Sequence, residues 1–263
     1  MKRRLIHSTD IAVSSLGLGT VKFGRNEKVK YPTAFELPSD KEILALLDLA
    51  QELGINFLDT APAYGLSEER IGSLLGSRRD DWVIMSKAGE DFIDGESQFD
   101  FSEKAITASV ERTLSRLHTD RVECLLLHSD GNDLDILDQS DAVEALTKLK
   151  NAGKVRSIGI STKTPDGGIR AINLGLDVVM ATFNPWQTEE EPVLDAAAKS
   201  GTSVFLKKAL GSGWFGEKSD VDPVETAFRF ILQKAAATSV IVGTLSQEHL
   251  RQNAITISQV DSD

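Results

Sequence analysis

The sequence has a single cysteine and no long apolar run, and each absence excludes a class of protein. One thiol, Cys124, in 263 residues rules out a disulfide framework, and its place in the apolar run at 122–127 favours a buried structural role. No apolar run reaches the roughly 20 residues that cross a bilayer. Polar residues follow the basic amino terminus, so no secretory signal is expected. We therefore expect a cytoplasmic protein that does not contact a membrane.

Histidine and positive charge are also scarce. The four histidines, His7, His118, His128 and His249, show no metal-ligand spacing, so no metal site is expected. The 29 lysines and arginines are outnumbered by 40 acidic residues, and the net charge of −11 argues against a nucleic-acid partner, which requires a basic stripe. An anionic cofactor stays compatible with this charge, because a few local donors can bind one phosphate.

Short β-rich apolar runs alternate with amphipathic helices along the whole chain. The expected strands cover 15–18, 56–58, 83–86, 122–127, 155–160, 178–182, 203–207 and 240–242. The expected helices include 39–53, 68–75, 102–117, 138–151, 192–200, 223–234 and 246–253. This alternation predicts an α/β fold with a parallel sheet, and eight strands without a domain break predict one (β/α)8 TIM barrel over 1–263. Residues 1–13 are expected to form a short hairpin that caps the barrel bottom.

Four polar residues are expected at the carboxyl ends of neighbouring strands, where the reactive groups of such barrels gather. Asp59 follows the second strand, Tyr64 lies five residues later, Lys87 ends the third strand and His128 ends the fourth. An ammonium stabilises a phenolate, and a carboxylate keeps that ammonium charged. With a histidine to orient a carbonyl oxygen or the phenol, such a site can protonate an oxygen while a hydride reaches the carbon. Each residue alone is explained by a rim ion pair or loop packing; the conjunction favours catalysis.

The sequence resembles the aldo-keto reductases over nearly its whole length. The most specific motif is GINFLDTAPAYG at 54–65, and LGLGT at 16–20, SEERIG at 67–72, KVRSIGIS at 154–161, FNP at 183–185, IVGT at 241–244 and EHL at 248–250 match as well. The resemblance implies a catalytic tetrad of Asp59, Tyr64, Lys87 and His128. Tyr64 would be the general acid in reduction and the general base in oxidation. It also implies NADPH or NADH extended across the barrel mouth.

The resemblance also implies a coenzyme site, from which this chain departs at several positions. The implied contacts are Gly19, Thr20, Asp59, Ser161, Thr162, Met180, Lys207, Leu210, Gly211, Gly213, Gly243, Thr244, His249, Gln252 and Asn253. Ser161 would hold the carboxamide, but Thr162 stands for the usual Asn and Met180 for the usual Gln. Lys207 replaces the tyrosine that stacks on the nicotinamide in many members. Residues 210–213 would expose backbone donors under the pyrophosphate; read alone, they form a plain loop.

The adenosine end of that site lacks cations that NADPH-preferring members often carry. In those members a lysine and an arginine are frequent at the positions of Gly243 and His249. Binding of a 2′-phosphate should therefore be weaker here unless Arg251 or a loop lysine substitutes. The resemblance to this family favours NADPH as the coenzyme, and NADH is possible.

The substrate is expected to be a small-molecule carbonyl compound. The chain ends soon after its last expected helix, so we expect an open pocket walled by residues 25–38, Phe92, Trp186 and Trp214, although at least one of these aromatics should pack as core. Such a pocket suits aldehydes and small ketones. Two alternatives stay open: a nicotinamide-binding redox-sensing subunit with little turnover, and a sugar (lactol) dehydrogenase that works oxidatively. We expect a monomer or a weak homo-oligomer.

Overall fold

Eight parallel strands close into a barrel in the computed structural model, which describes residues 1–29, 31, 33–213 and 222–262. The strands are β3 (Leu16–Gly19), β4 (Phe57–Asp59), β5 (Val83–Ala88), β8 (Val122–His128), β9 (Val155–Ser161), β10 (Val178–Thr182), β11 (Ser203–Lys207) and β12 (Ala237–Val242). Each hydrogen-bonds to the next, and β12 pairs with β3 to close the ring. All eight correspond to predicted strands. The (β/α)8 fold class is confirmed.

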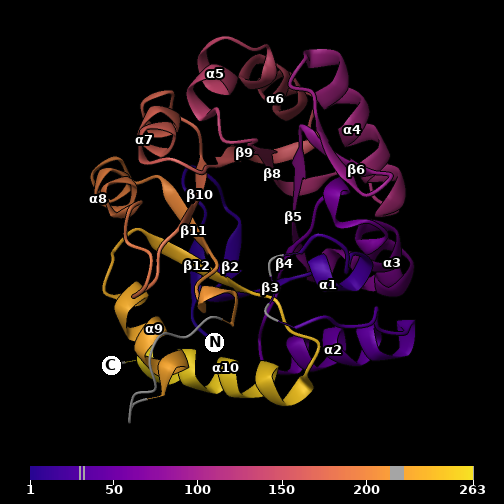
Figure 1. Cartoon of the computed structure of the whole chain (residues 1–263), viewed down its shortest axis with the longest axis vertical. Helices are drawn as coiled ribbons and strands as arrows, with labels where there is room; N and C mark the ends of the chain where they lie inside the picture. The colour runs from indigo at the N-terminus through magenta and orange to yellow at the C-terminus, as the bar shows by residue number, and fades with distance from the viewer. Residues whose placement is uncertain (30, 32, 214–221, 263) are drawn as a thin grey trace.

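Helices surround this barrel, as Figure 1 shows. They are α1 (Val21–Gly24), α2 (Asp40–Glu52), α3 (Ser67–Leu75), α4 (Glu103–Arg116), α5 (Asp133–Asp138), α6 (Ala142–Asn151), α7 (Pro165–Asn173), α8 (Glu191–Ser200), α9 (Pro223–Leu232) and α10 (Gln247–Val260). In place of the single helix predicted over 138–151, the structure has α6, which begins at Ala142, and a separate α5 before it. Helix α7 is not among the predicted helices, because its Gly167 and Gly168 are weak helix formers; Thr164 caps this helix and Pro165 opens it.

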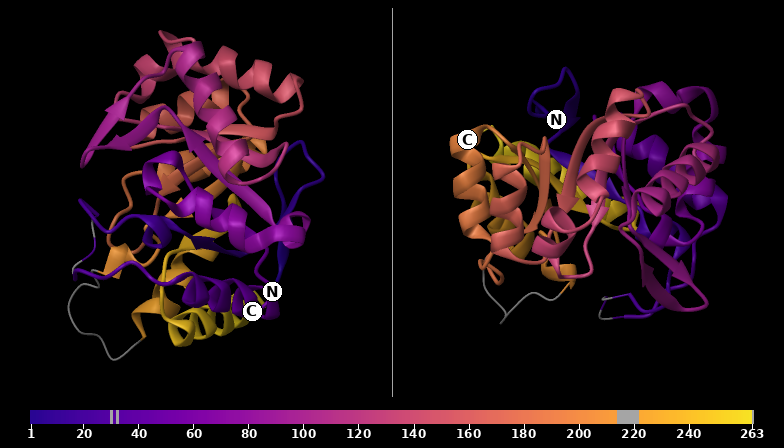
Figure 2. Two further views of the ribbon diagram at one scale, coloured as in Figure 1. Left: turned by 90° about the vertical axis from the view of Figure 1, so that its right-hand side faces the viewer. Right: turned by 90° about the horizontal axis from the view of Figure 1, so that it is seen from above.

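A hairpin of β1 (Arg3–Leu5) and β2 (Ala12–Ser14) closes the amino-terminal end of the barrel. Ile6, Ile11 and Val13 share one apolar cluster with interior barrel side chains such as Phe57 and Phe205. The right view of Figure 2 shows this indigo hairpin at one end of the molecule. The predicted cap is therefore present, and it buries apolar side chains against the barrel floor.

A second hairpin, β6 (Glu90–Ile93) with β7 (Glu96–Phe99), lies at the opposite end of the barrel. It follows β5 directly and packs beside the 3₁₀ turn Pro62–Tyr64. This hairpin gives no strand signal in the sequence, because its strands are polar and mostly exposed and lack the alternation of a half-buried strand. This hairpin brings Glu90 to the rim where the chemistry is expected.

Within the described residues, no helix is both long enough and apolar enough to span a membrane.

Candidate active site

The four predicted catalytic residues lie at the carboxyl ends of adjacent strands. Asp59 ends β4, Lys87 lies near the end of β5 and His128 ends β8, while Tyr64 ends the 3₁₀ turn after β4. Side chains alternate between the two faces of a strand. Lys87 therefore shares the inner face of β5 with Met85, which belongs to the interior apolar cluster. The charged groups form the top layer of the barrel interior.

Lys87 is the centre of this layer. Its Nζ donates hydrogen bonds to the Asp59 carboxylate, to the Thr60 carbonyl at 3.0 Å and to the Tyr64 hydroxyl at 3.0 Å. Lys87 is 1% exposed and Asp59 6%. Burial alone would lower the pKa of Lys87, but Asp59 and Tyr64 outweigh it and raise the pKa above its ordinary value. The ammonium therefore stays charged at neutral pH.

Tyr64 keeps its proton at neutral pH. Burial and the negative charge of Asp59 raise the pKa of the phenol to about 12, although Lys87 opposes this through its charge and its hydrogen bond. The stabilising effect of the ammonium on the phenolate, expected from the sequence, is present, but burial outweighs it. A protonated phenol beside a fixed ammonium can donate its proton and leave a stabilised phenolate.

His128 faces both the phenol and a carboxylate that sequence reasoning missed. Its ring lies edge-on to Tyr64, with centroids 6.2 Å apart, and its Nδ1 is 2.7 Å from Oε2 of Glu90. Burial lowers the pKa of His128, against the opposing effect of Glu90. Burial would raise the pKa of Glu90, but His128 and the Ser97 hydroxyl bring it down to about 2. The unpredicted hairpin β6–β7 thus supplies a charged partner for the histidine.

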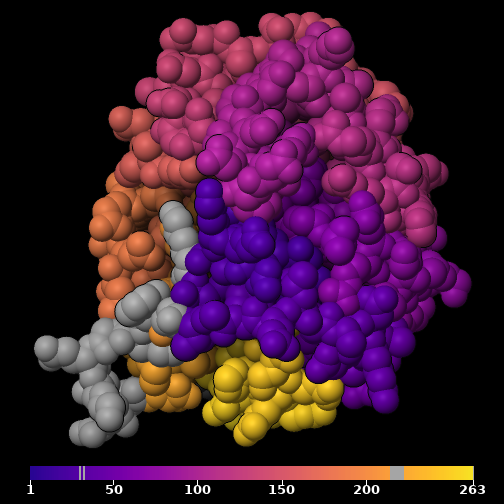
Figure 3. Space-filling view, turned by 45° about the vertical axis from the view of Figure 1, so that its right-hand side comes forward, coloured from indigo at the N-terminus to yellow at the C-terminus, as the bar shows by residue number. Residues whose placement is uncertain are grey.

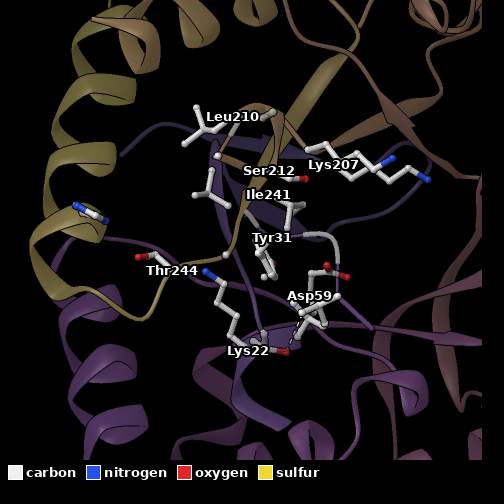
Figure 4. A pocket seen from close by; sticks show the side chains of 18 of the residues that line it. Lys22, Tyr31, Asp59, Lys207, Leu210, Ser212, Ile241 and Thr244 are labelled. Carbon is white, nitrogen blue, oxygen red and sulfur yellow. Dashed lines mark hydrogen bonds between the residues drawn. The ribbon is translucent and has the colours of Figure 1, made fainter. Parts of the chain in front are cut away.

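A cavity of about 690 Å³ opens beside the tetrad and reaches α10. The predicted coenzyme contacts that line it are Gly19, Thr20, Asp59, Lys207, Leu210, Gly213, Gly243, Thr244, His249, Gln252 and Asn253. Tyr64 lines it as well. Figure 4 shows Lys22 and Thr244 on one side of Ile241 and Lys207 on the other. Residues from both ends of the chain therefore meet in one elongated space.

Four predicted coenzyme contacts do not line this cavity: Ser161, Thr162, Met180 and Gly211. Thr162 is buried and its hydroxyl donates to Glu190, while Met180 packs in the interior apolar cluster. Ser161 is connected to the cavity through Lys207, whose Nζ donates to the Ser161 hydroxyl at 2.9 Å. The two loop amides expected to face a pyrophosphate, those of Gly211 and Gly213, donate to the chain's own Lys208 and Leu210 carbonyls.

Cations that the sequence analysis did not single out line the cavity in this acidic protein. They are Lys22, Arg25, Lys28 and Lys208. The ammonium of Lys22 lies 4.0 Å from the centroid of the Tyr31 ring, and burial lowers its pKa. Gly243 faces the same space, where a Cβ would come within 3.3 Å of the Tyr31 hydroxyl. A side chain at 243 would therefore be tightly packed, and the cations of this cavity come from other positions in its wall. Only the 25–38 loop as a whole was predictable as part of this wall.

The expected aromatic walls are only partly found. Tyr31 of the 25–38 loop lines the cavity, whereas Phe92 packs under the Arg25 guanidinium at 3.5 Å and Trp186 is 36% exposed beside Gly211. Trp214 lies outside the described residues.

Figure 3 shows the indigo surface of the early chain between the purple surface above it and the yellow surface of α10. Among the described residues, no three histidine, cysteine or acidic side chains gather as a metal site.

Known proteins match this arrangement over almost the whole chain. The sequence model of the aldo/keto reductase family matches residues 15–222. D-threo-aldose 1-dehydrogenase of a Pseudomonas species is 30% identical over 93% of this chain and 89% of its own length. NADH-specific methylglyoxal reductase of Escherichia coli is 24% identical over 100% of this chain and 96% of its own.

Solved structures agree with the sequence relatives. A Pseudomonas aeruginosa protein assigned to the aldo-keto reductases superposes with a TM-score of 0.89 at 45% identity, covering 98% of this chain and 95% of its own. A holo-form aldo-keto reductase from Bacillus halodurans has a TM-score of 0.81 at 23% identity, covering 100% and 94%, and this likeness shows the fold. The chain therefore belongs to the aldo/keto reductase family of oxidoreductases.

Proposed function

We propose that this protein transfers a hydride between a nicotinamide coenzyme and a carbonyl carbon, with Tyr64 as the proton donor in reduction. One observation carries the proposal: Lys87 contacts both the Asp59 carboxylate and the Tyr64 hydroxyl at the inner end of a cavity lined by cations. An ordinary ion pair would not need to hold a phenol in the wall of that cavity.

Each residue of the tetrad has its own role in the proton transfer. Tyr64 donates its proton to the carbonyl oxygen, and Lys87 stabilises the phenolate that remains. Asp59 keeps Lys87 charged, and His128, whose ring lies edge-on to that of Tyr64, orients the carbonyl oxygen. The bound coenzyme would supply the hydride. In the oxidative direction the phenolate accepts the alcohol proton.

The cavity suits an anionic dinucleotide, although the whole protein is acidic. Lys22, Lys28 and Lys208 line it, and the Thr244 and Asn253 side chains lie at its α10 end. Local cations can bind phosphate despite a net charge of −11. With Gly243 and His249 at positions that often hold cations, Lys22 or Lys28 would have to neutralise a 2′-phosphate. We propose NADPH as the coenzyme, with NADH as an acceptable substitute.

The substrate class proposed is aldehydes and small ketones. The alternative of sugar oxidation is favoured by the similarity to a D-threo-aldose 1-dehydrogenase. Coenzyme consumption with 4-nitrobenzaldehyde and methylglyoxal, compared with NAD(P)⁺-linked oxidation of aldoses, separates the two directions.

The test of the reaction uses the two tyrosines of the chain, Tyr31 and Tyr64, both of which line the cavity. Tyr64→Phe should lower kcat/KM by about 10³-fold, within the range for general acid catalysis. Tyr31→Phe removes a hydroxyl from the same cavity and should change kcat/KM by no more than a few-fold. Equal turnover in Tyr64→Phe and the wild type would refute the reaction. Tight coenzyme binding without turnover in the wild type would support a redox-sensing subunit instead.

A further inference from the structure

Lys207 places a second ammonium at the tetrad end of the cavity. It ends β11, and on the inner face of this strand it lies one layer above Phe205 of the interior apolar cluster. Its Nζ donates to the Ser161 hydroxyl at 2.9 Å and to the Thr162 carbonyl. Ser161 pairs in register with His128 of the tetrad. Lys207 therefore spans the end of β10 and contacts the end of β9, the strand next to β8 with His128.

The charge of Lys207 has no close counterion in the described part of the chain. Among the described residues, no carboxylate lies within ion-pair distance of the Lys207 Nζ, whereas the Asp59 carboxylate pairs with the Nζ of Lys87. Glu190 is the strongest acidic influence on Lys207, but its carboxylate already accepts hydrogen bonds from the Thr162 hydroxyl at 2.9 Å and the Thr182 amide at 2.7 Å.

Further charges face Lys207 from the neighbouring elements. Lys208 and Lys87 repel its charge, Asp133 favours it, and His128 lies within its electrostatic reach. Burial, the largest effect, lowers the pKa of Lys207 to about 8. The side chain thus changes charge just above neutral pH.

Two of the side chains at the positions that the resemblance assigns to the nicotinamide, Thr162 and Met180, offer no free polar group. The Thr162 hydroxyl is committed to Glu190, and the Met180 side chain is apolar. An ammonium has three donors, and the two hydrogen bonds of Lys207 leave one N–H for a carbonyl acceptor in the cavity.

The reaction itself dictates what lies beside Lys207. The hydride must reach the carbon whose oxygen is bound by Tyr64, so the hydride-carrying ring occupies the tetrad end of the cavity. That ring is neutral in the reduced coenzyme and cationic in the oxidised one. Building on the function proposed above, we propose that Lys207 binds the carboxamide end of the nicotinamide, and that its positive charge makes the cavity bind the reduced coenzyme in preference to the oxidised one.

This preference depends on pH in a defined direction. Lys207 is charged below about pH 8 and neutral above it. Repulsion of the oxidised ring is therefore strong near pH 7 and largely lost by pH 9.5. Binding of the neutral reduced ring changes less, so the ratio of the two dissociation constants follows the protonation of Lys207.

The experiment measures this ratio, Kd(NAD⁺)/Kd(NADH), by fluorescence titration at pH 7 and pH 9.5. NAD⁺ and NADH are used because they lack a 2′-phosphate that titrates near neutrality. At pH 7 the ratio should be about tenfold larger in the wild type than in Lys207→Met, as expected for two charges a few ångströms apart in a partly screened site. At pH 9.5 the wild-type ratio should approach that of Lys207→Met, while Lys207→Arg should keep a high ratio at both pH values.

Lys208→Met is the matched control, because it removes the same charge from the adjacent, more exposed residue. Because Lys208 also lines the cavity, its loss should weaken NAD⁺ and NADH alike through the phosphates that both share, so the ratio should stay within about twofold of the wild type. Equal ratios for the wild type and Lys207→Met at pH 7, or a wild-type ratio that does not change with pH, would overturn the assignment of Lys207. If the wild type binds neither dinucleotide, the proposed function and this inference fail together. If it binds both, with turnover that requires Tyr64 but an unchanged ratio, only this inference fails.

Discussion

The two ends of the barrel are built from the same strands but hold opposite kinds of residue. At the amino-terminal end, Ile6 and Val13 of the β1–β2 hairpin seal the interior with fully buried apolar groups. At the carboxyl-terminal end, Asp59 and Lys87 bring charge into a layer that is almost equally buried. The sealed end contributes burial free energy, whereas the charged end can change protonation and bind ligands. Substitutions at the two ends should therefore affect different measurements.

The largest effect is expected for Lys87→Met. Loss of the ammonium removes the group that stabilises the Tyr64 phenolate, so kcat/KM should fall by about 10³-fold. Asp59 then stays buried without its partner, and the free energy of unfolding should also fall, by about 3 kcal/mol. Steady-state kinetics and urea unfolding measure the two effects. Lys28→Met, an exposed cation on the same cavity, should not reproduce the kinetic loss; an equal loss there would remove the special role of Lys87.

The next effect belongs to the sealed end. Ile6→Ala should lower the free energy of unfolding by about 3 kcal/mol, because it deletes buried methylene and methyl groups and leaves a cavity. Activity of the folded protein should stay within about twofold. Leu5→Ala is the control, since Leu5 is 63% exposed and its truncation should cost under about 0.5 kcal/mol. A loss of activity in Ile6→Ala without a loss of stability would break the comparison between the ends.

A smaller effect is expected where the unpredicted hairpin meets the tetrad. The Glu90 carboxylate favours the charged form of His128, so Glu90→Gln should lower the pKa of His128 further. Any limb of the pH–rate profile that reports this histidine should move to lower pH. NMR titration of the His128 ring measures the shift directly. Ser97→Ala keeps the carboxylate and should give a smaller shift; an upward shift in Glu90→Gln would contradict the assigned charges.

The smallest effect is expected for a residue that caps a helix and takes no part in the chemistry. The Ser102 hydroxyl caps α4 by accepting a hydrogen bond from the Ala105 amide. Ser102→Ala should lower the free energy of unfolding by about 1 kcal/mol with unchanged kinetics. Ser102→Thr keeps a capping hydroxyl and should recover most of the stability in thermal unfolding. A kinetic defect in Ser102→Ala would show that α4 helps to position the tetrad.

The amino-terminal end of the barrel was largely predictable from the sequence, and the carboxyl-terminal end only in part. Eight apolar runs and the residue types of Asp59, Tyr64, Lys87 and His128 follow from local pattern, because a parallel barrel must bring the ends of its strands together. The hairpin that holds Glu90 has a polar, exposed pattern and gave no periodic signal. The hydrogen bonds of Lys207 depend on the placement of three strands, which no local window of sequence contains. The acidity of Tyr64 depends on burial, which likewise appears only in the folded chain.

The most direct test of the central claim is a crystal structure of the protein with NADPH and a carbonyl-containing inhibitor. We expect a dinucleotide extended along the cavity from Lys207 to Asn253, with the inhibitor's carbonyl oxygen on the Tyr64 hydroxyl. Its carbonyl carbon should lie about 3–3.5 Å from the hydride-bearing carbon of the ring. A dinucleotide bound elsewhere, or a carbonyl group oriented away from Tyr64 and Lys87, would contradict the account.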